Sequence, residues 1–111
     1  MKDDTLYLRH MAEAIAKIDR YLTGISYEAF AANDLLIDGV IRELEIIGEA
    51  GNNISKEFQK SHPEIPFFNM ISMRNRLIHD YAGVDIHTVW QTVKEDLPAL
   101  QNFLRQVLSA L

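Results

Sequence analysis

The sequence predicts an all-α protein: an antiparallel bundle of four main helices plus one short extra helix, with the last helix kinked or split near Pro98. Three observations carry this prediction. Apolar residues recur three and four positions apart along most of the 111-residue chain, which is the spacing of one helix face. No stretch alternates apolar and polar residues over the length of a β-strand. The segments between the periodic stretches are short, which favours antiparallel neighbours.

The first helix is expected over about Asp4 to Leu22. Leu8 begins a run of apolar residues at helical spacing there, and Gly24 follows the run as a C-terminal stop. Ser26 is then expected to cap a short helical turn with the sequence YEAFAA, because serine accepts hydrogen bonds from the exposed N–H groups of a helix start.

A long helix is expected to open at Asn33 or Asp34 and to extend to about Ile54, with a wide apolar stripe. Glycine inside a helix is unfavourable by about 1 kcal/mol. This helix nevertheless holds Gly39, Gly48 and Gly51. These glycines indicate the close approach of another backbone, and tight helix packing is favoured over access for a ligand.

The segment KEFQKSHPEIP is expected to be a connecting loop. A third helix then begins at Pro66, in the first-turn position that suits proline. It is expected to run to about Tyr81, and Gly83 follows as the residue that stops it.

The last helix is capped by Asp85 and buries a long apolar face. Pro98 lies inside it. Proline lacks the N–H that would continue the helical hydrogen bonds, so the helix should kink or divide near Asp96.

The composition favours a folded single domain over residues 1–111. The chain is 48% hydrophobic and 24% charged and contains no cysteine, so disulfides and thiolate metal sites are excluded and a cytoplasmic location is expected. No apolar run approaches the roughly 20 residues that span a bilayer. The net charge of −5 argues against broad nonspecific coating of nucleic acid, but leaves room for a locally basic cleft.

The stretch RNRLIHDY, which begins at Arg74, ends the most hydrophobic segment of the chain. Arg74 falls within the apolar arc of the third helix, where an arginine is costly unless it is paired or lies at an interface. Two arrangements remain open. The helix lines a cleft between two copies of the chain, or Arg74 pairs with a carboxylate of the preceding helix. The candidate carboxylates are Glu43, Glu45 and Glu49.

Arg74 and His79 together suit cleavage of an RNA phosphodiester without a metal. Arginine binds phosphate through a permanently charged fork, and histidine exchanges protons near neutral pH. Asn75 would orient the imidazole or bind the phosphate, and Arg76 is a further candidate phosphate contact. Structural roles also remain open: a histidine in a last helical turn interacts favourably with the helix dipole, and Tyr81 suits a core position with its hydroxyl at the surface.

The remaining histidines, His10, His62 and His87, show no metal-ligand spacing with one another or with His79. We therefore expect them to be surface or packing residues and expect no metal site. Trp90 is expected in the core or at a dimer interface.

The segments MRNRLIHDYAGVD, VIRELEIIGEA and VWQTVKEDLPAL resemble the HEPN family, in its HepT-like branch of toxin–antitoxin proteins. The family motif is Arg, four residues, His, one residue and Tyr, matched by Arg74, His79 and Tyr81. Phe67 departs from the tryptophan that relatives often carry after IP. The resemblance covers nearly the whole chain. It implies a homodimer whose two motifs face a shared cleft, and a metal-independent ribonuclease that acts as the toxin of a type VII system.

The resemblance also implies a partner, an MNT-type nucleotidyltransferase antitoxin that can transfer AMP from ATP onto Tyr81. A tethered nucleotide beside Arg74 and His79 would block the RNA site. No cofactor is expected, since the ATP chemistry belongs to the partner. Two other interpretations stay open. One is a noncatalytic helical module that presents nucleotide or substrate to such a nucleotidyltransferase, and the other is a dimeric structural bundle in which Arg74 is salt-bridged.

Overall fold

Helices alone form the regular structure of the described chain, so the predicted all-α bundle is confirmed. The computed structural model describes residues 3–79 and 83–110, with the backbone alone at His79. In chain order the elements are α1 (Asp4–Leu22), α2 (Tyr27–Ala31), α3 (Asp34–Asn53), α4 (Lys56–Ser61), α5 (Phe67–His79), α6 (Ile86–Gln91), η2 (Thr92–Asp96) and α7 (Leu97–Ser109).

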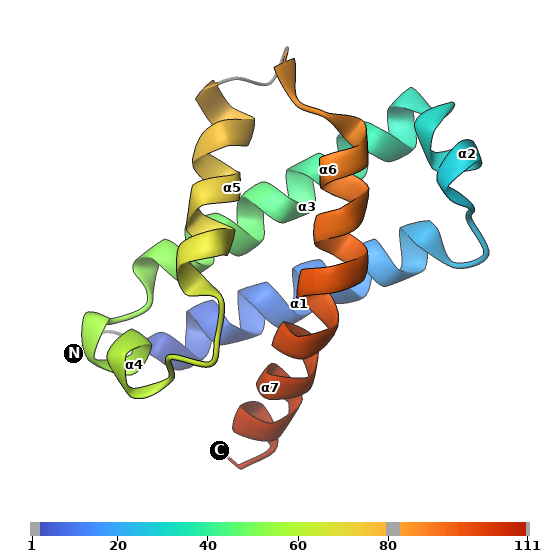
Figure 1. Cartoon of the computed structure of the whole chain (residues 1–111). Coiled ribbons are helices and arrows are strands. Elements are labelled where there is room, and N and C mark those ends of the chain that lie inside the picture. The colour runs from blue at the N-terminus through green and yellow to red at the C-terminus, as the bar shows by residue number, and fades with distance from the viewer. Residues whose placement is uncertain (1–2, 80–82, 111) are drawn as a thin grey trace.

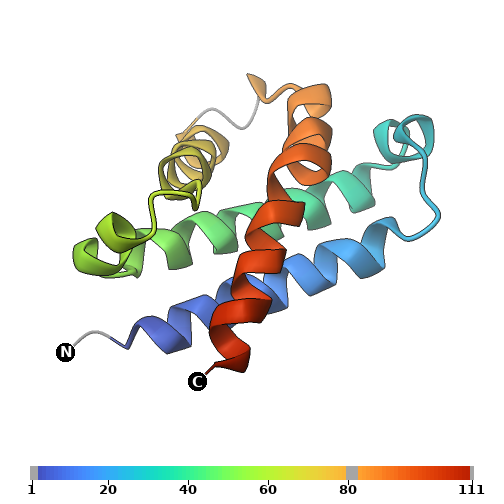
Figure 2. The ribbon, with the colours of Figure 1, turned by 60° about the horizontal axis from the view of Figure 1, so that its bottom comes forward.

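Two antiparallel pairs of helices cross each other. α1 and α3 lie side by side, and α5 and the rod formed by α6, η2 and α7 run across them (Figures 1 and 2). α3 packs extensively against both α1 and α5, and α7 packs against α1. The buried core lies between the pairs and includes Met11, Ile18, Val40, Ile47 and Leu100. α3 is therefore the central element that positions α5.

Side-chain caps fix the predicted helix starts. Asp3 accepts a hydrogen bond from the backbone N–H of Leu6 at 3.2 Å and so opens α1. Three further caps start α2, α3 and α6, at Ser26, Asn33 and Asp85. α1 ends as expected, with Gly24 in the left-handed region at φ 73°.

The expectation of a loop over KEFQKSHPEIP is wrong for its first six residues, because Lys56–Ser61 forms α4, and holds for residues 62–66. Ser55 caps it by accepting from the N–H of Phe58 at 3.1 Å. The carboxylate of Asp4 also accepts from the N–H and the hydroxyl of Ser55, both at 2.8 Å. The half-buried Phe58 ring meets the ring of Phe103 edge-on at 6.3 Å. These distant contacts stabilise a helix that has no periodic apolar face of its own.

The third predicted helix begins one residue later than expected. Phe67 is its first residue, and the carbonyl of Pro66 accepts from the N–H of Met70 at 3.0 Å. Its described part ends at His79, so the expected end near Tyr81 lies outside the described residues.

The last helix is divided near Asp96, as the position of Pro98 predicted. A π-helical segment, Thr92–Asp96, separates α6 from α7, and Pro98 lies in the first turn of α7. Proline removes one backbone donor, and the wider π-helical turn accommodates the change of hydrogen-bond register. The predicted split near Pro98 is confirmed.

Trp90 is half-buried and packs against the edge of the core, while the expected alternative of a dimer interface stays a prediction. Its ring lies 5.2 Å from the ring of Phe30 and 5.6 Å from that of Tyr27, and the Lys94 ammonium lies 4.6 Å above it. α2 is thereby held against α6.

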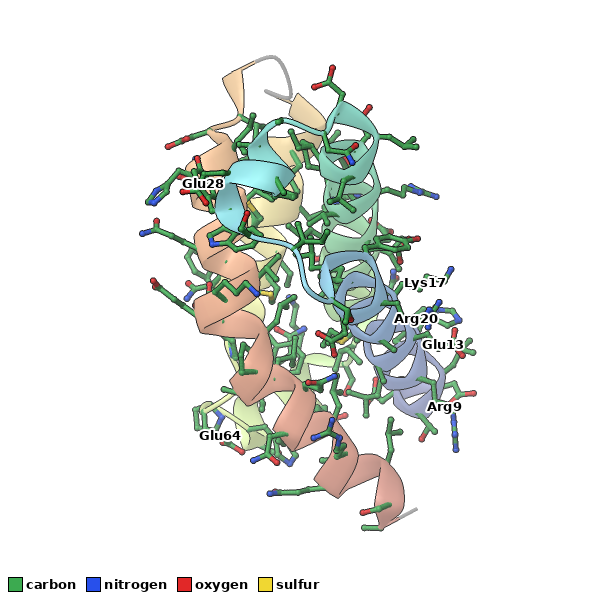
Figure 3. All side chains as sticks on the ribbon, turned by 90° about the vertical axis from the view of Figure 1, so that its right-hand side faces the viewer. Arg9, Glu13, Lys17, Arg20, Glu28 and Glu64 are labelled. Atoms are coloured by element: carbon green, nitrogen blue, oxygen red, sulfur yellow. The ribbon has the colours of Figure 1, made fainter. Side chains whose placement is uncertain are left out.

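The outer face of α1 is charged. Figure 3 shows Arg9, Glu13, Lys17 and Arg20 along this face, directed away from the core. Across residues 3–79 and 83–110, no helix is both long and apolar enough to cross a membrane.

Candidate active site

Gly48 positions Arg74. A Cβ atom at Gly48 would collide with the Cβ of Arg74 and lie 2.8 Å from the carbonyl oxygen of Met70. α5 therefore approaches α3 more closely than any other residue at position 48 would allow. This confirms the packing interpretation at Gly48. A Cβ at Gly51 would make an ordinary contact with Phe67, at 3.7 Å.

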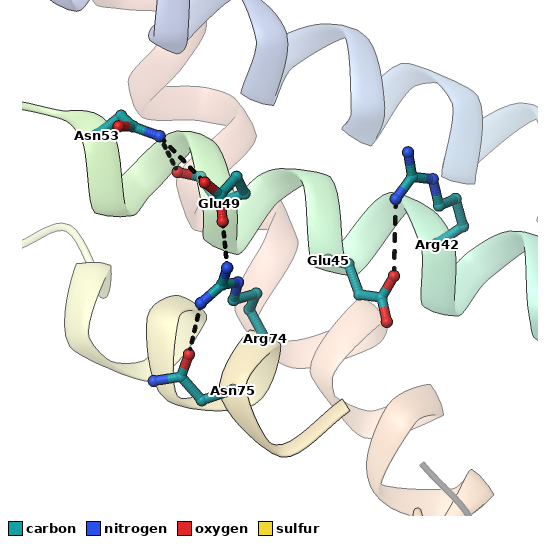
Figure 4. Close-up of polar contacts among 6 residues, drawn as sticks. All are labelled: Arg42, Glu45, Glu49, Asn53, Arg74 and Asn75. Carbon is teal, nitrogen blue, oxygen red and sulfur yellow. Dashed lines mark hydrogen bonds and ion pairs between the residues drawn. The ribbon is translucent and has the colours of Figure 1, made fainter. Parts of the chain in front are cut away.

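The guanidinium of Arg74 lies between two polar side chains (Figure 4). One terminal nitrogen forms an ion pair with Glu49 of α3, and the other donates to the Asn75 side-chain oxygen at 2.8 Å. Glu49 was one of the three predicted carboxylates. Of the other two, Glu45 lies 3.8 Å from Arg42, and Glu43 is buried.

The ion pair leaves Arg74 available for exchange. The Arg74 side chain is 25% exposed and that of Glu49 is 53% exposed. Pairs as exposed as this contribute about 0–1 kcal/mol to stability. Among the described residues the Nε of Arg74 finds no hydrogen-bond partner although it is buried. A phosphate offers a bidentate geometry and charge that compete well with one exposed carboxylate.

A pocket of about 340 Å³ opens beside Arg74. Tyr7 and His10 of α1, and Arg42 and Glu49 of α3, help to line it. His10 was expected to be a surface or packing residue. It is exposed, and its ring meets the Tyr7 ring edge-on at 6.0 Å, but it also belongs to the wall of this pocket. The i, i+3 spacing of these two rings was the available sequence signal, and it shows only that they share a helix face.

The structure separates Arg76 from Arg74. Arg76 is exposed and lines a different pocket of about 210 Å³ with Ser72 and Asp96. Burial, and then repulsion from Glu95, raises the pKa of the Asp96 carboxyl. Arg76 and Arg74 therefore face different surroundings.

His79 occupies the end of the described part of α5. On an ideal helix, five residues place it roughly 140° round the axis from Arg74. Tyr81 lies outside the described residues. The structure thus brings together Arg74 and Asn75, and places the His79 backbone just over one turn further on.

His62 and His87 pack as expected. Nδ1 of His62 lies 3.0 Å from the carbonyl oxygen of Phe58, and the two rings stack at 4.2 Å. The His87 ring meets the Tyr27 ring edge-on at 5.6 Å. Within the described ranges, His, Asp and Glu side chains form no group of three placed to hold a metal ion.

The structure thus defines an all-α bundle with a pocket that two arginines help to line. A family model described as "Ribonuclease HepT-like" matches residues 11–107. The chain belongs to this HepT-like family of ribonucleases.

Similar chains carry related names. A protein named "Probable ribonuclease HepT" from Thermococcus cleftensis is 48% identical over 95 residues, which is 86% of each chain. A candidate RNase of Caldanaerobacter subterraneus subsp. tengcongensis is 35% identical over 108 residues, covering 97% of this chain and 96% of its own. One from Methanocaldococcus jannaschii is 34% identical over 110 residues, 99% of this chain and 95% of its own. No solved structure matches the chain.

Proposed function

We propose that this chain is a metal-independent endoribonuclease that acts as a homodimer in the cytoplasm, as the toxin of a type VII toxin–antitoxin system. Membership of the HepT-like ribonuclease family supports the activity. The observation that carries the assignment to this site is the position of Arg74, which lines a pocket and is held by an exposed carboxylate that a phosphate can replace.

The proposed reaction uses Arg74 and His79 in separate roles. The 2′-hydroxyl oxygen of the RNA attacks the adjacent phosphorus, the bond to the 5′ oxygen breaks, and a 2′,3′-cyclic phosphate forms. Histidine accepts the 2′ proton or donates a proton to the departing 5′ oxygen, and Arg74 stabilises the negative charge that builds on the phosphoryl oxygens. Two copies of the chain supply two of each residue, which meets the need for both an acid and a base. Asn75 holds the Arg74 fork.

Neutralisation is proposed to occur by AMP transfer from ATP to the hydroxyl of Tyr81, catalysed by a cognate MNT-type nucleotidyltransferase. The new phosphodiester carries a negative charge and a bulky nucleoside close in sequence to the phosphate-binding arginine. Intact mass spectrometry after co-expression with the partner should show one added adenylate on the wild type and none on Tyr81→Phe. An adenylate on Tyr81→Phe would remove this role from Tyr81.

RNA cleavage in EDTA tests the nuclease proposal. The unmodified chain is incubated with tRNA and mRNA, beside His79→Ala and the control His87→Ala, which changes an exposed histidine of α6. We expect cleavage by the wild type and the control, and none by His79→Ala. If the wild type is dimeric, unmodified and inert on both RNAs, the nuclease proposal is wrong and the chain is a binding module for its nucleotidyltransferase.

A further inference from the structure

The pocket beside Arg74 has the dimensions of a ligand site. Its volume is about 340 Å³, and small-molecule sites in proteins typically hold about 300–1,000 Å³. Three helices, α1, α3 and α5, contribute its walls. The pocket is therefore formed by the packing of three helices and not by a single loop.

One wall offers surfaces for a nucleobase. Tyr7 and His10 present two rings inclined at 86° to each other. Ile46 of α3 and Ile78 of α5 add apolar lining, and Ile78 is 42% exposed. RNA-binding sites hold single-stranded bases by stacking them on tyrosine and histidine rings. A base is flat and stacks through its faces, so it fits this lining better than a sugar or a small anion does.

A second arginine, Arg42, lines the same pocket at a distance from Arg74. The Arg42 side chain is 71% exposed, and its guanidinium lies 3.8 Å from the Glu45 carboxylate. Figure 4 shows Arg42 on α3 well separated from Arg74, which lies on α5 beside Glu49. Two turns of α3, about 10 Å, lie between Arg42 and Glu49, the residue that holds Arg74. The two guanidinium groups are therefore placed for two different phosphates of a chain.

The charges that line the pocket favour a phosphodiester strand over a nucleoside triphosphate. Glu45 and Glu49 line it beside the two arginines, so its formal charges cancel when His10 is neutral. A triphosphate carries several charges on adjacent groups and would leave most of them unpaired against these carboxylates. A phosphodiester strand places one charge at each nucleotide. Arg74 can exchange the exposed carboxylate of Glu49 for one such charge, and Arg42, itself exposed, can exchange the 3.8 Å contact with Glu45 for another.

We propose that this pocket is a nucleotide subsite that holds one nucleotide of the RNA next to the scissile phosphodiester. The base lies against Tyr7 and His10, Arg42 binds the phosphate at the far side of that nucleotide, and Arg74 binds the scissile phosphate. The subsite rests on the proposed ribonuclease function, and it adds α1 and the middle of α3 to the RNA-binding surface.

Binding of an RNA that cannot be cleaved tests the subsite. A fluorescently labelled 2′-O-methyl oligonucleotide lacks the attacking hydroxyl, so its dissociation constant is measured by anisotropy across a series of KCl concentrations. Arg42→Ala should weaken binding about five- to tenfold and reduce the slope of log K against log [salt] by about 0.7, the value for one phosphate contact with a single strand. The control Arg20→Ala, on the outer face of α1 (Figure 3), should bind as the wild type.

The ring wall is tested at His10. His10→Ala should weaken binding about fivefold or more, and His10→Phe, which keeps a ring, should recover most of the affinity. Circular dichroism establishes that each variant is folded. Wild-type affinity and salt slope in both Arg42→Ala and His10→Ala would overturn the subsite, even if cleavage is normal. If the wild type never cleaves RNA but binding depends on Arg42 and His10, the proposed reaction fails and the pocket stands as an RNA-binding site without a scissile phosphate.

Discussion

Gly48 of α3 lies directly against the Cβ of Arg74 of α5, at a separation that leaves no space for a side chain at position 48. This contact sets the register between the two helices. Glu49, the next residue of α3, then comes within ion-pair distance of the Arg74 guanidinium. A packing contact between two backbones thus places the charged group of the candidate active site.

Gly48→Ala is expected to destabilise the fold. The new Cβ would overlap Arg74 and the Met70 carbonyl, so the free energy of unfolding should fall by about 1–3 kcal/mol, despite a gain of about 1 kcal/mol in helix propensity. Urea denaturation measures it. Gly39→Ala is the matched control, because its Cβ would meet only the side-chain ring of Tyr21 at 3.4 Å. The control should be unchanged or slightly more stable. Equal stabilities for the two variants would contradict the close-packing account.

Glu49→Gln is expected to tighten RNA binding. The substitution keeps the size of the side chain but removes the charge that competes with phosphate for Arg74. Since exposed ion pairs contribute up to about 1 kcal/mol, the dissociation constant for the 2′-O-methyl oligonucleotide should fall about two- to fivefold. Glu28→Gln removes the same charge from α2, at an exposed position (Figure 3). An equal gain in that control would assign the effect to net charge and remove the role of Glu49.

Asp96→Asn is expected to stabilise the protein at neutral pH. Burial raises the pKa of the Asp96 carboxyl above its ordinary value of 3.8, with a further contribution from Glu95. The folded state therefore holds this proton more tightly than the unfolded state, so stability falls as pH rises from the ordinary pKa through the raised one. At pH values above that window, the ionised Asp96 carboxylate lowers the stability of the folded state. Asp96 makes no side-chain capping bond to α7, so asparagine loses no such contact.

Thermal unfolding at a series of pH values checks this prediction. The melting temperature of Asp96→Asn should exceed that of the wild type at neutral pH, and the difference should shrink as pH falls through the window. A difference that stays constant with pH would show that titration of Asp96 is not its cause.

The sequence correctly predicted the helices whose starts and ends are determined by neighbouring residues. Asp4–Leu22 matches the expected first helix, and Asn33 and Asp85 open the helices they were expected to open. Each of these starts depends on a side chain that caps its own helix, so neighbouring residues contain the information. The division before Pro98 has the same local origin.

Features that depend on distant packing were not predictable in the same way. α4 contains one apolar residue, Phe58, and its start is tied to Asp4, 51 residues earlier than Ser55. The selection of Glu49 from three nearby carboxylates depends on the register that Gly48 sets. The pocket beside Arg74 depends on where α1 lies, so His10 could not be connected with Arg74 from its sequence position.

The most direct test of the account measures stability and RNA cleavage together for Arg74→Ala. Alanine keeps the Cβ that packs against Gly48 but loses the ion pair with Glu49, the hydrogen bond to Asn75 and the half-buried Arg74 stem. The free energy of unfolding should therefore fall by about 1–2 kcal/mol, which leaves the variant folded. Cleavage of tRNA and mRNA in EDTA should fall by about a hundredfold or more, as when a group that stabilises transition-state charge is removed. A variant that unfolds, or a folded variant that cleaves RNA at the wild-type rate, would contradict the assignment of Arg74 to phosphate chemistry.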